Sequence, residues 1–347
     1  MLESNLLRSL GTKLAIGVAL FASLSVAACG NTSTAGTSGT TTPSSLTACT
    51  ATVQDITQAA NGNASGPAGV TLTGSLKIDG SSALQPLFAQ AAKEFVTTGV
   101  TPQVSAGGSG TGLSDVDKGN VDIGMSDLFQ ADKGISDLTD HQVAVVAFTL
   151  VVSNDLKGKV GNLTTDQIKK IYTGAYTNWS QLGGPNELIT VVNRPTTSGT
   201  RGTFETYVLG GKIESGGTTL TQDNTGAVFQ AVNSGQGAIG YVSTGFVTTS
   251  DAANAPVPIC IDGYKASAND INAGTYHFWN VEHAYTKGSA AGNAKAFLQY
   301  VESSAFQTHD LATLNFYQTS SISPSAVTAH LAAGGESSAP APESFYQ

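Results

Sequence analysis

The chain has 347 residues, a formal net charge of −9 and a pI of about 4.9, and only 12% of its residues are charged. These values argue against a basic nucleic-acid-binding surface and exclude a coiled coil and a charged disordered chain. Three cysteines are too few for a disulfide-rich scaffold. A chain of this length is expected to form about two domains.

The N-terminus has the pattern of a secretory signal. Arg8 and Lys13 flank the start of an apolar run of 15 residues, 14–28, which is short for a membrane-spanning helix of about 20 residues. The run ends in the letters VAAC at Cys29, which resembles the lipobox of bacterial lipoproteins. We therefore expect residues 1–28 to be removed and Cys29 to carry a lipid. The alternative is an ordinary signal peptide followed by a chance cysteine.

The segment after the signal predicts a tethered protein. Residues 30–48 are rich in Ser, Thr and Gly and carry no charge, so we expect residues 29–70 to be a flexible tether. This predicts a lipid-anchored location on the extracytoplasmic side of the cell membrane, in the periplasm or at the cell surface. Outside the cytoplasm Cys49 and Cys260 are expected to pair, although the sequence does not show their geometry. The C-terminal stretch, residues 321–347, is expected to be disordered.

Apolar spacing predicts alternating strands and helices from about residue 72 onward. One face of the predicted helix within 81–96 carries apolar residues at helical spacing. Thr164 and Gln167 form a capping-box pattern at the start of another helix. The alternation favours an α/β fold with mostly parallel sheets. The segments that carry it are 74–80, 81–96, 101–119, 121–127, 141–155, 163–174, 187–211 and 226–243.

Three loops combine glycine with small hydroxyl residues, and each follows a predicted strand and precedes a predicted helix. A helix N-terminus presents unpaired N–H groups and partial positive charge, so three such ends at one point would surround a small anion with donors. Each loop taken alone is better explained as an ordinary helix cap or tight turn, and the case for an anion site depends on all three together. The loops are Gly80-Ser81-Ser82, Gly107-Gly108-Ser109-Gly110-Thr111 and Thr197-Ser198-Gly199-Thr200.

Two charged residues adjoin these loops. Arg194 lies four residues before Ser198, where it would contact an oxyanion, or else form a surface ion pair. Asp127 ends the segment VDIGMSD, where it would accept a proton from a ligand, or else cap a helix. Phosphate carries a proton at neutral pH and sulfate does not, so a carboxylate favours phosphate.

The ordered motifs GSS, GGSGTG, VDIGMSD, NRPTTSGTRGTF and GAIGYV resemble the phosphate-binding proteins of bacterial ABC phosphate importers, from about Gly74 to Val242. The resemblance implies a two-lobed type II periplasmic binding protein fold, with mixed, mostly parallel sheets joined by two hinge strands. This chain has Thr196 where family members often carry an acidic residue after the arginine. The resemblance implies these phosphate ligands: Ser82, the N–H of Ala83, Ser109, Asp127, Arg194, Ser198, Gly199 and Thr200.

The implied function is that of a membrane-anchored receptor, a monomer, which binds inorganic phosphate in an interlobe cleft and delivers it to an ABC permease. The alternatives are a receptor for another tetrahedral oxyanion (sulfate or tungstate) and a phosphate-binding sensor or phosphatase. The expected lobes are 71–148 with 278–320, and 149–277.

Enzyme motifs are missing from the sequence. It contains no G-x-x-x-x-G-K-[ST] loop and no G-x-S-x-G elbow, and its five histidines form no H-E-x-x-H or H-x-H pair. We therefore expect no catalysis, no cofactor, no metal and no nucleic-acid partner.

Overall fold

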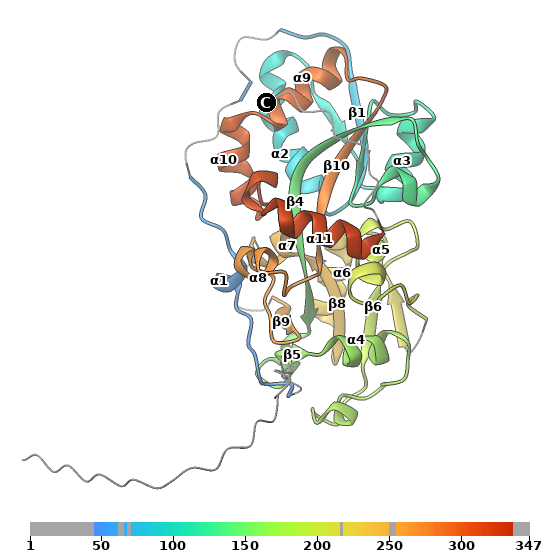
Figure 1. Cartoon of the computed structure of the whole chain (residues 1–347), viewed down its shortest axis with the longest axis vertical. Coiled ribbons are helices and arrows are strands. Elements are labelled where there is room, and N and C mark those ends of the chain that lie inside the picture. The colour runs from blue at the N-terminus through green and yellow to red at the C-terminus, as the bar shows by residue number, and fades with distance from the viewer. Residues whose placement is uncertain (1–44, 62–65, 68–70, 216–217, 250–254, 336–347) are drawn as a thin grey trace, which may run out of the picture. The chain divides into compact units, whose positions relative to one another are not determined.

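The computed structural model describes residues 45–61, 66–67, 71–215, 218–249 and 255–335 (Figure 1). The expected signal peptide and the lipidation site Cys29 lie outside these residues and stay predictions. Strands and helices alternate along the described chain, which confirms the predicted mixed α/β fold. Ten strands form the sheet, with the order β2-β1-β3-β10-β4-β8-β6-β7 and with β9 and β5 attached through β4.

The first part of the sheet comes from parallel strands that each lead into a loop or helix. β1 (Leu76–Gly80) lies between β2 (Pro102–Val104) and β3 (Ile123–Ser126) and is parallel to both. α2 (Gln85–Phe95) follows β1, and α3 (Ser109–Asp117) follows β2. Two of the predicted hydroxyl-rich loops thus lie at the carboxyl ends of neighbouring strands, where α/β proteins commonly bind ligands.

Two long antiparallel strands connect this part to the rest of the sheet. β4 (Leu138–Val152) and β10 (Trp279–Lys287) run side by side (Figure 1), and β10 separates β4 from β3. Residues 148–152 of β4 pair instead with β8 (Ala238–Ser243). The last three of them also pair with β9 (Val257–Ile261). Strand β4 therefore belongs to both parts of the sheet, and the residue boundaries expected for the two lobes stay a prediction.

The second part of the sheet is again largely parallel. β6 (Thr190–Asn193) is parallel to β8 and to β7 (Thr218–Thr221), and β5 (Asn162–Leu163) is parallel to β9. The predicted capping box is present, because Thr164 accepts a hydrogen bond from the N–H of Gln167. The helices of this part are α4 (Thr165–Tyr172), α5 (Gly199–Tyr207), α6 (Thr225–Ser234), α7 (Thr244–Thr248) and α8 (Ala268–Asn272).

Helices late in the chain pack on the helix that follows β1. α9 (Gly292–Val301) and α10 (Ser304–Thr313) pack against α2. The ring of Phe297 on α9 lies 5.4 Å from that of Phe88 and 5.2 Å from that of Phe95, both edge to face. Short 3₁₀ helices span Val96–Thr98, Gln130–Lys133, Asn154–Leu156, Trp179–Leu182 and Thr319–Ser321.

The prediction of a flexible tether is wrong for residues 45–58. Leu46, Ala51 and Ile56 are buried, and residues Val53–Ile56 form the short helix α1. Cys49 forms a disulfide with Cys260 of β9, with 6.1 Å between the two Cα atoms. Burial of these three apolar side chains and the disulfide fix the segment to the fold. The Ser- and Thr-rich composition around them therefore does not predict its structure.

The prediction of disorder from residue 321 onward is wrong for the residues that form α11 (Pro324–Gly334). The Ser323 side chain caps the helix, Pro324 occupies its first position, and Gly335 ends it with a φ of 83°. Serine, proline and glycine at these positions are the usual start and stop signals of a helix. Residues 336–347 lie outside the described ranges.

Candidate functional site

The first hydroxyl-rich loop divides two roles between adjacent serines. The Ser81 side chain accepts hydrogen bonds from the N–H groups of Ala83 and Leu84, both at 3.1 Å, and so holds the turn that leads into α2. The Ser82 hydroxyl points to the second part of the fold, where it lies 3.0 Å from Thr225 Oγ1 at the start of α6. The N–H of Ala83, which the resemblance implies as a phosphate donor, is therefore bonded to Ser81 in this structure.

Arg194 follows β6 and is only 1% exposed. Its guanidinium donates from Nη1 to Thr225 Oγ1 at 3.2 Å, and from Nη2 to Ser82 Oγ at 3.1 Å and the Asp223 carbonyl at 3.0 Å. All three acceptors are uncharged. Within the described ranges no carboxylate forms an ion pair with Arg194, so the surface ion pair considered for it is wrong. Burial lowers the pKa of Arg194.

Asp127 lies directly after β3 and accepts hydrogen bonds from two hydroxyl groups. Ser109, the first residue of α3, donates to Oδ1 at 3.2 Å and accepts from the Asp127 N–H at 3.0 Å. Thr200, in the first turn of α5, donates to Oδ2 at 2.9 Å. The next helix, Gln130–Lys133, has Phe129 at its N-cap position, so the alternative in which Asp127 caps a helix is wrong.

The loop between Arg194 and Thr200 packs closely on the loop before α3. Ser198 caps α5 by accepting from the Arg201 N–H at 3.2 Å. The Gly110 N–H donates to the Thr197 carbonyl at 3.0 Å. A Cβ atom at Gly199 would lie 2.2 Å from Ser109 Oγ, so this position requires glycine. The two hydroxyl-rich loops therefore lie in direct contact.

The site thus consists of two adjoining clusters, each of which joins the first part of the fold to the second. One is made by Ser82, Arg194 and Thr225, and the other by Ser109, Asp127 and Thr200. The starts of α2, α3, α5 and α6 meet here and contribute the partial positive charge of their N-termini. A buried cation, helix N-termini and one carboxylate together suit a small oxyanion that itself carries a hydrogen.

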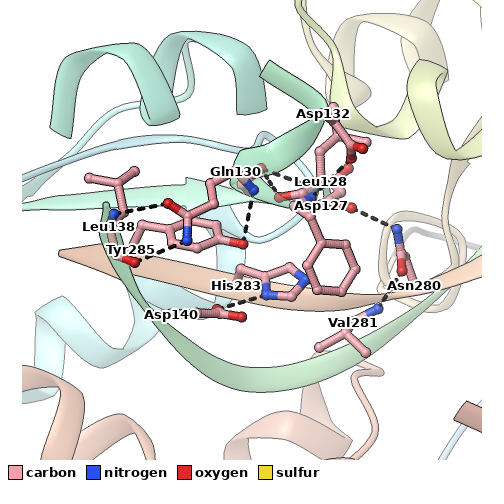
Figure 2. Close-up of polar contacts among 12 residues, drawn as sticks. Asp127, Leu128, Gln130, Asp132, Leu138, Asp140, Asn280, Val281, His283 and Tyr285 are labelled. Atoms are coloured by element: carbon pink, nitrogen blue, oxygen red, sulfur yellow. Dashed lines mark hydrogen bonds and ion pairs between the residues drawn. The ribbon is translucent and has the colours of Figure 1, made fainter. Parts of the chain in front are cut away.

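A layer of buried polar groups supports the turn that holds Asp127 (Figure 2). Asn280 of β10 donates to the Asp127 carbonyl at 2.7 Å. Gln130 exchanges two hydrogen bonds with the backbone of Leu138, at 2.9 and 3.0 Å. His283 Nδ1 lies 2.8 Å from Asp140 Oδ1, and both side chains are buried. These contacts fix β3, β4 and β10 around the carboxylate.

Sequence reasoning missed three residues of this region. Thr225 at the start of α6 resembles the other hydroxyl groups at helix starts, so the same pattern could have found it. Asn280 and Glu282 are polar residues at alternate positions of the buried strand β10, and both are at most 1% exposed. Polar side chains in an otherwise buried strand are a usable signal, although they do not reveal which neighbour they contact.

Other features of the described residues lie apart from this site. A hollow of about 270 Å³ lies beside the disulfide-linked segment, between residues 47–53, 157–161 and 255–258, and shares no residue with the site. Among the described residues no group of His, Cys, Asp and Glu is arranged to hold a metal ion. No described helix has the length and apolar character needed to cross a bilayer.

The known proteins that are similar to this chain agree with one another in family and in fold. The chain matches the PBP superfamily domain over residues 32–305. The phosphate-binding protein PstS of Bacillus subtilis (strain 168) is 44% identical over 240 residues, which cover 68% of this chain and 77% of that protein. The crystal structure of a phosphate ABC transporter substrate-binding protein from Clostridium perfringens, with bound phosphate, is 28% identical, with a TM-score of 0.63 over 71% of this chain and 100% of that chain.

An ABC-type phosphate transport receptor from Vibrio cholerae shares the fold, with a TM-score of 0.57 and 24% identity over 70% of this chain and 99% of that chain. The fold is that of the type II periplasmic binding proteins, as predicted. The chain belongs to the PBP superfamily and, within it, to the family of PstS phosphate-binding proteins.

Proposed function

We propose that this protein is the receptor of an ABC importer, which binds inorganic phosphate and delivers it to the membrane permease. The proposal places phosphate at the two clusters described above, and Ala83 takes part if its N–H turns from Ser81 to the ligand. The B. subtilis relative is a phosphate-binding protein, and the C. perfringens relative contains phosphate. The proposed ligands are Ser82, Ala83, Ser109, Asp127, Arg194, Ser198, Gly199 and Thr200.

The observation that carries this proposal is that Arg194, whose hydrogen bonds among the described residues all go to neutral acceptors, interacts with the Asp127 carboxylate, which accepts from two hydroxyl groups. The cation attracts an oxyanion, and the carboxylate requires that oxyanion to supply a hydrogen. A charge-assisted hydrogen bond contributes about 1.5–3 kcal/mol net, and micromolar affinity needs about 8 kcal/mol, so a few such contacts suffice. Sulfate would leave Asp127 facing a second negative group with no hydrogen between them.

We also infer where the protein acts and how it binds its ligand. The protein acts outside the cytoplasm as a monomer, is anchored through a lipid on Cys29, and binds its ligand without covalent chemistry. The basic, apolar and VAAC pattern of residues 1–29 supports the anchor. Mass spectrometry of the protein purified from membranes tests it, since Cys29 is expected to be the modified first residue.

Titration calorimetry with phosphate, sulfate and tungstate tests the ligand assignment. We expect one phosphate bound per chain with micromolar or tighter affinity, and sulfate bound at least 100-fold more weakly, about 2.7 kcal/mol. Tighter binding of sulfate or tungstate would assign the site to another oxyanion. Turnover of a phosphomonoester that is lost in Ser198→Ala would instead identify a phosphatase.

A further inference from the structure

Glu282 of β10 lies beside Asp127 but has no role in the site as described so far. In the β3–β10 ladder, His283 is opposite Ser126 and Ala284 is opposite Met125. The ladder ends at the His283–Ser126 pair, and the next residue of β10, Glu282, interacts with Asp127, the residue that follows β3. Asn280, two residues along β10, bonds to the Asp127 carbonyl, which confirms that this face of β10 meets Asp127.

The two carboxyl groups differ in their partners. Asp127 accepts from the hydroxyls of Ser109 and Thr200. Glu282 is fully buried, and no donor of the described residues lies within hydrogen-bond distance of either of its oxygens. Two adjacent buried carboxyl groups cannot both ionise without a large cost, and the proton belongs on the group that lacks donors. That group is Glu282.

The charged groups around the pair agree with this assignment. The Asp127 carboxylate is the charged neighbour that acts on Glu282, and it also interacts with the Arg194 guanidinium. His283, the next residue of β10, pairs with Asp140 of β4. Burial, followed by the Asp127 carboxylate, raises the pKa of Glu282 well above its ordinary value.

We propose that Glu282 is a positioning residue of the anion site, a neutral acid at neutral pH that donates its hydrogen to Asp127. This role, which rests on the proposed function, has two effects on a hydrogen-bearing oxyanion such as phosphate. The bond holds the Asp127 carboxylate in place with an oxygen lone pair free to accept the ligand's hydrogen. The neutral state of Glu282 also keeps a second negative charge away from the bound anion.

Infrared spectroscopy of the ligand-free protein tests the proton directly. The measurement compares wild type with Glu282→Gln at pH 8.5. This pH is chosen because burial raises the pKa of two other carboxyl groups, that of Glu214 to about 7 and that of Asp310 to about 6. Those two groups are therefore largely ionised under these conditions. We expect the wild-type spectrum to contain the C=O band of a protonated carboxylic acid that the variant lacks. A difference spectrum with only the bands of an ionised carboxylate overturns the proposal.

Binding measurements test the positioning role. Glu282→Leu removes the donor, and we expect phosphate affinity to fall about tenfold or more at pH 7, equivalent to the loss of one good hydrogen bond. Glu282→Gln supplies an amide donor of similar shape and should recover most of this loss. Glu302→Gln, at the end of α9, controls for the loss of a carboxyl group elsewhere. Circular dichroism and thermal unfolding verify that each variant is folded.

Two binding results contradict the proposal. If Glu282→Gln binds phosphate and sulfate tenfold more tightly than wild type, Glu282 was ionised and repelled both anions. If Glu282→Leu, correctly folded, binds phosphate as wild type does, Glu282 does not position Asp127. Failure of the proposed function is a separate result, because the wild-type protein would then not bind phosphate while the infrared spectrum still reports the proton on Glu282.

Discussion

Arg194 is a buried positive charge whose hydrogen-bond partners are a serine, a threonine and a backbone carbonyl. Thr196, two residues after Arg194, is uncharged. Arg201 reinforces the arrangement by donating to the Arg194 carbonyl at 2.7 Å, and it forms its own ion pair with Glu205 at 2.9 Å. The charge of Arg194 is therefore directed at the site and is not neutralised by a bonded carboxylate.

We expect Arg194→Ala to weaken phosphate binding by about 2–4 kcal/mol, because Arg194 is the one cation among the proposed ligands. Arg194→Lys retains the charge but not the planar fork of donors, so its affinity should lie between those of wild type and the alanine variant. Calorimetry measures all three proteins. An alanine variant that binds phosphate within threefold of wild type would show that Arg194 does not contact the ligand.

Asp127→Asn tests selectivity more than affinity. The amide keeps one acceptor oxygen and adds N–H donors, so it can bond an oxyanion that has no hydrogen. We expect the preference for phosphate over sulfate to fall at least tenfold, about 1.4 kcal/mol, while phosphate itself binds less tightly by a smaller factor. Competition calorimetry with both anions provides the ratio. Unchanged exclusion of sulfate would contradict the role assigned to this carboxylate.

At the scale of elements, helix α11 contributes a histidine to the fold. His330 is 4% exposed and stacks between two aromatic rings, with centroids 3.7 Å from Tyr207 of α5 and 3.9 Å from Trp279 of β10. Burial, and to a smaller extent His277, lower the pKa of His330 to about 3 from its ordinary 6.5. The contact holds α11 on the rest of the fold through a neutral imidazole.

This contact predicts acid sensitivity of the fold. Between pH 6.5 and 3 the unfolded chain binds a proton at His330 that the folded protein does not, so the free energy of unfolding falls as the pH decreases. At pH 4 the loss amounts to about 3 kcal/mol relative to pH 7. Urea unfolding at pH 7 and pH 4 measures this loss. The free energy of unfolding should fall less between these pH values in His330→Phe than in wild type, by about 3 kcal/mol. His309→Gln on α10 is the control, and an equal acid loss in wild type and His330→Phe would contradict the prediction.

Local signals made several elements predictable. The capping box at Thr164, the apolar face of α2 and the hydroxyl-rich loops depend on neighbours within a few residues, so the sequence displays them. The insertion of β10 between β3 and β4 is a pairing of distant segments, and no local pattern indicates it. Glu282 was missed for the same reason, because its partner Asp127 is more than 150 residues away. α11 was missed because the Gly-, Ser- and Pro-rich residues after it dominated the composition.

At the scale of the molecule, the disulfide joins residues separated by 211 positions. Closing so long a loop restricts the unfolded chain, which corresponds to about 2–4 kcal/mol of stability. We expect a reducing agent to lower the free energy of unfolding of wild type by this amount and to leave the double variant Cys49→Ser, Cys260→Ser unaffected. Equal stability of wild type with and without reductant would argue against a stabilising bond.

The overall charge leads to a prediction about salt. A chain with a formal charge of −9 does not attract anions over long distances, so binding must depend on buried local contacts. Such contacts are screened less than exposed charges. We expect phosphate affinity to change by less than about threefold between 0.05 and 0.15 M salt. Calorimetry at both concentrations checks this, and a collapse of binding at the higher one would point to an exposed electrostatic site.

The central position of β10 has a consequence for the order in which the chain can fold. Strand β3 ends at Ser126, but its neighbour in the sheet is completed only at Lys287. As the ribosome or a secretion channel releases the chain from its N-terminus, the edge of β3 stays open until more than four fifths of the protein has emerged. If a chain with this topology is exported, its sheet cannot be completed until translocation is nearly over. The chain therefore stays unfolded enough to pass through a channel.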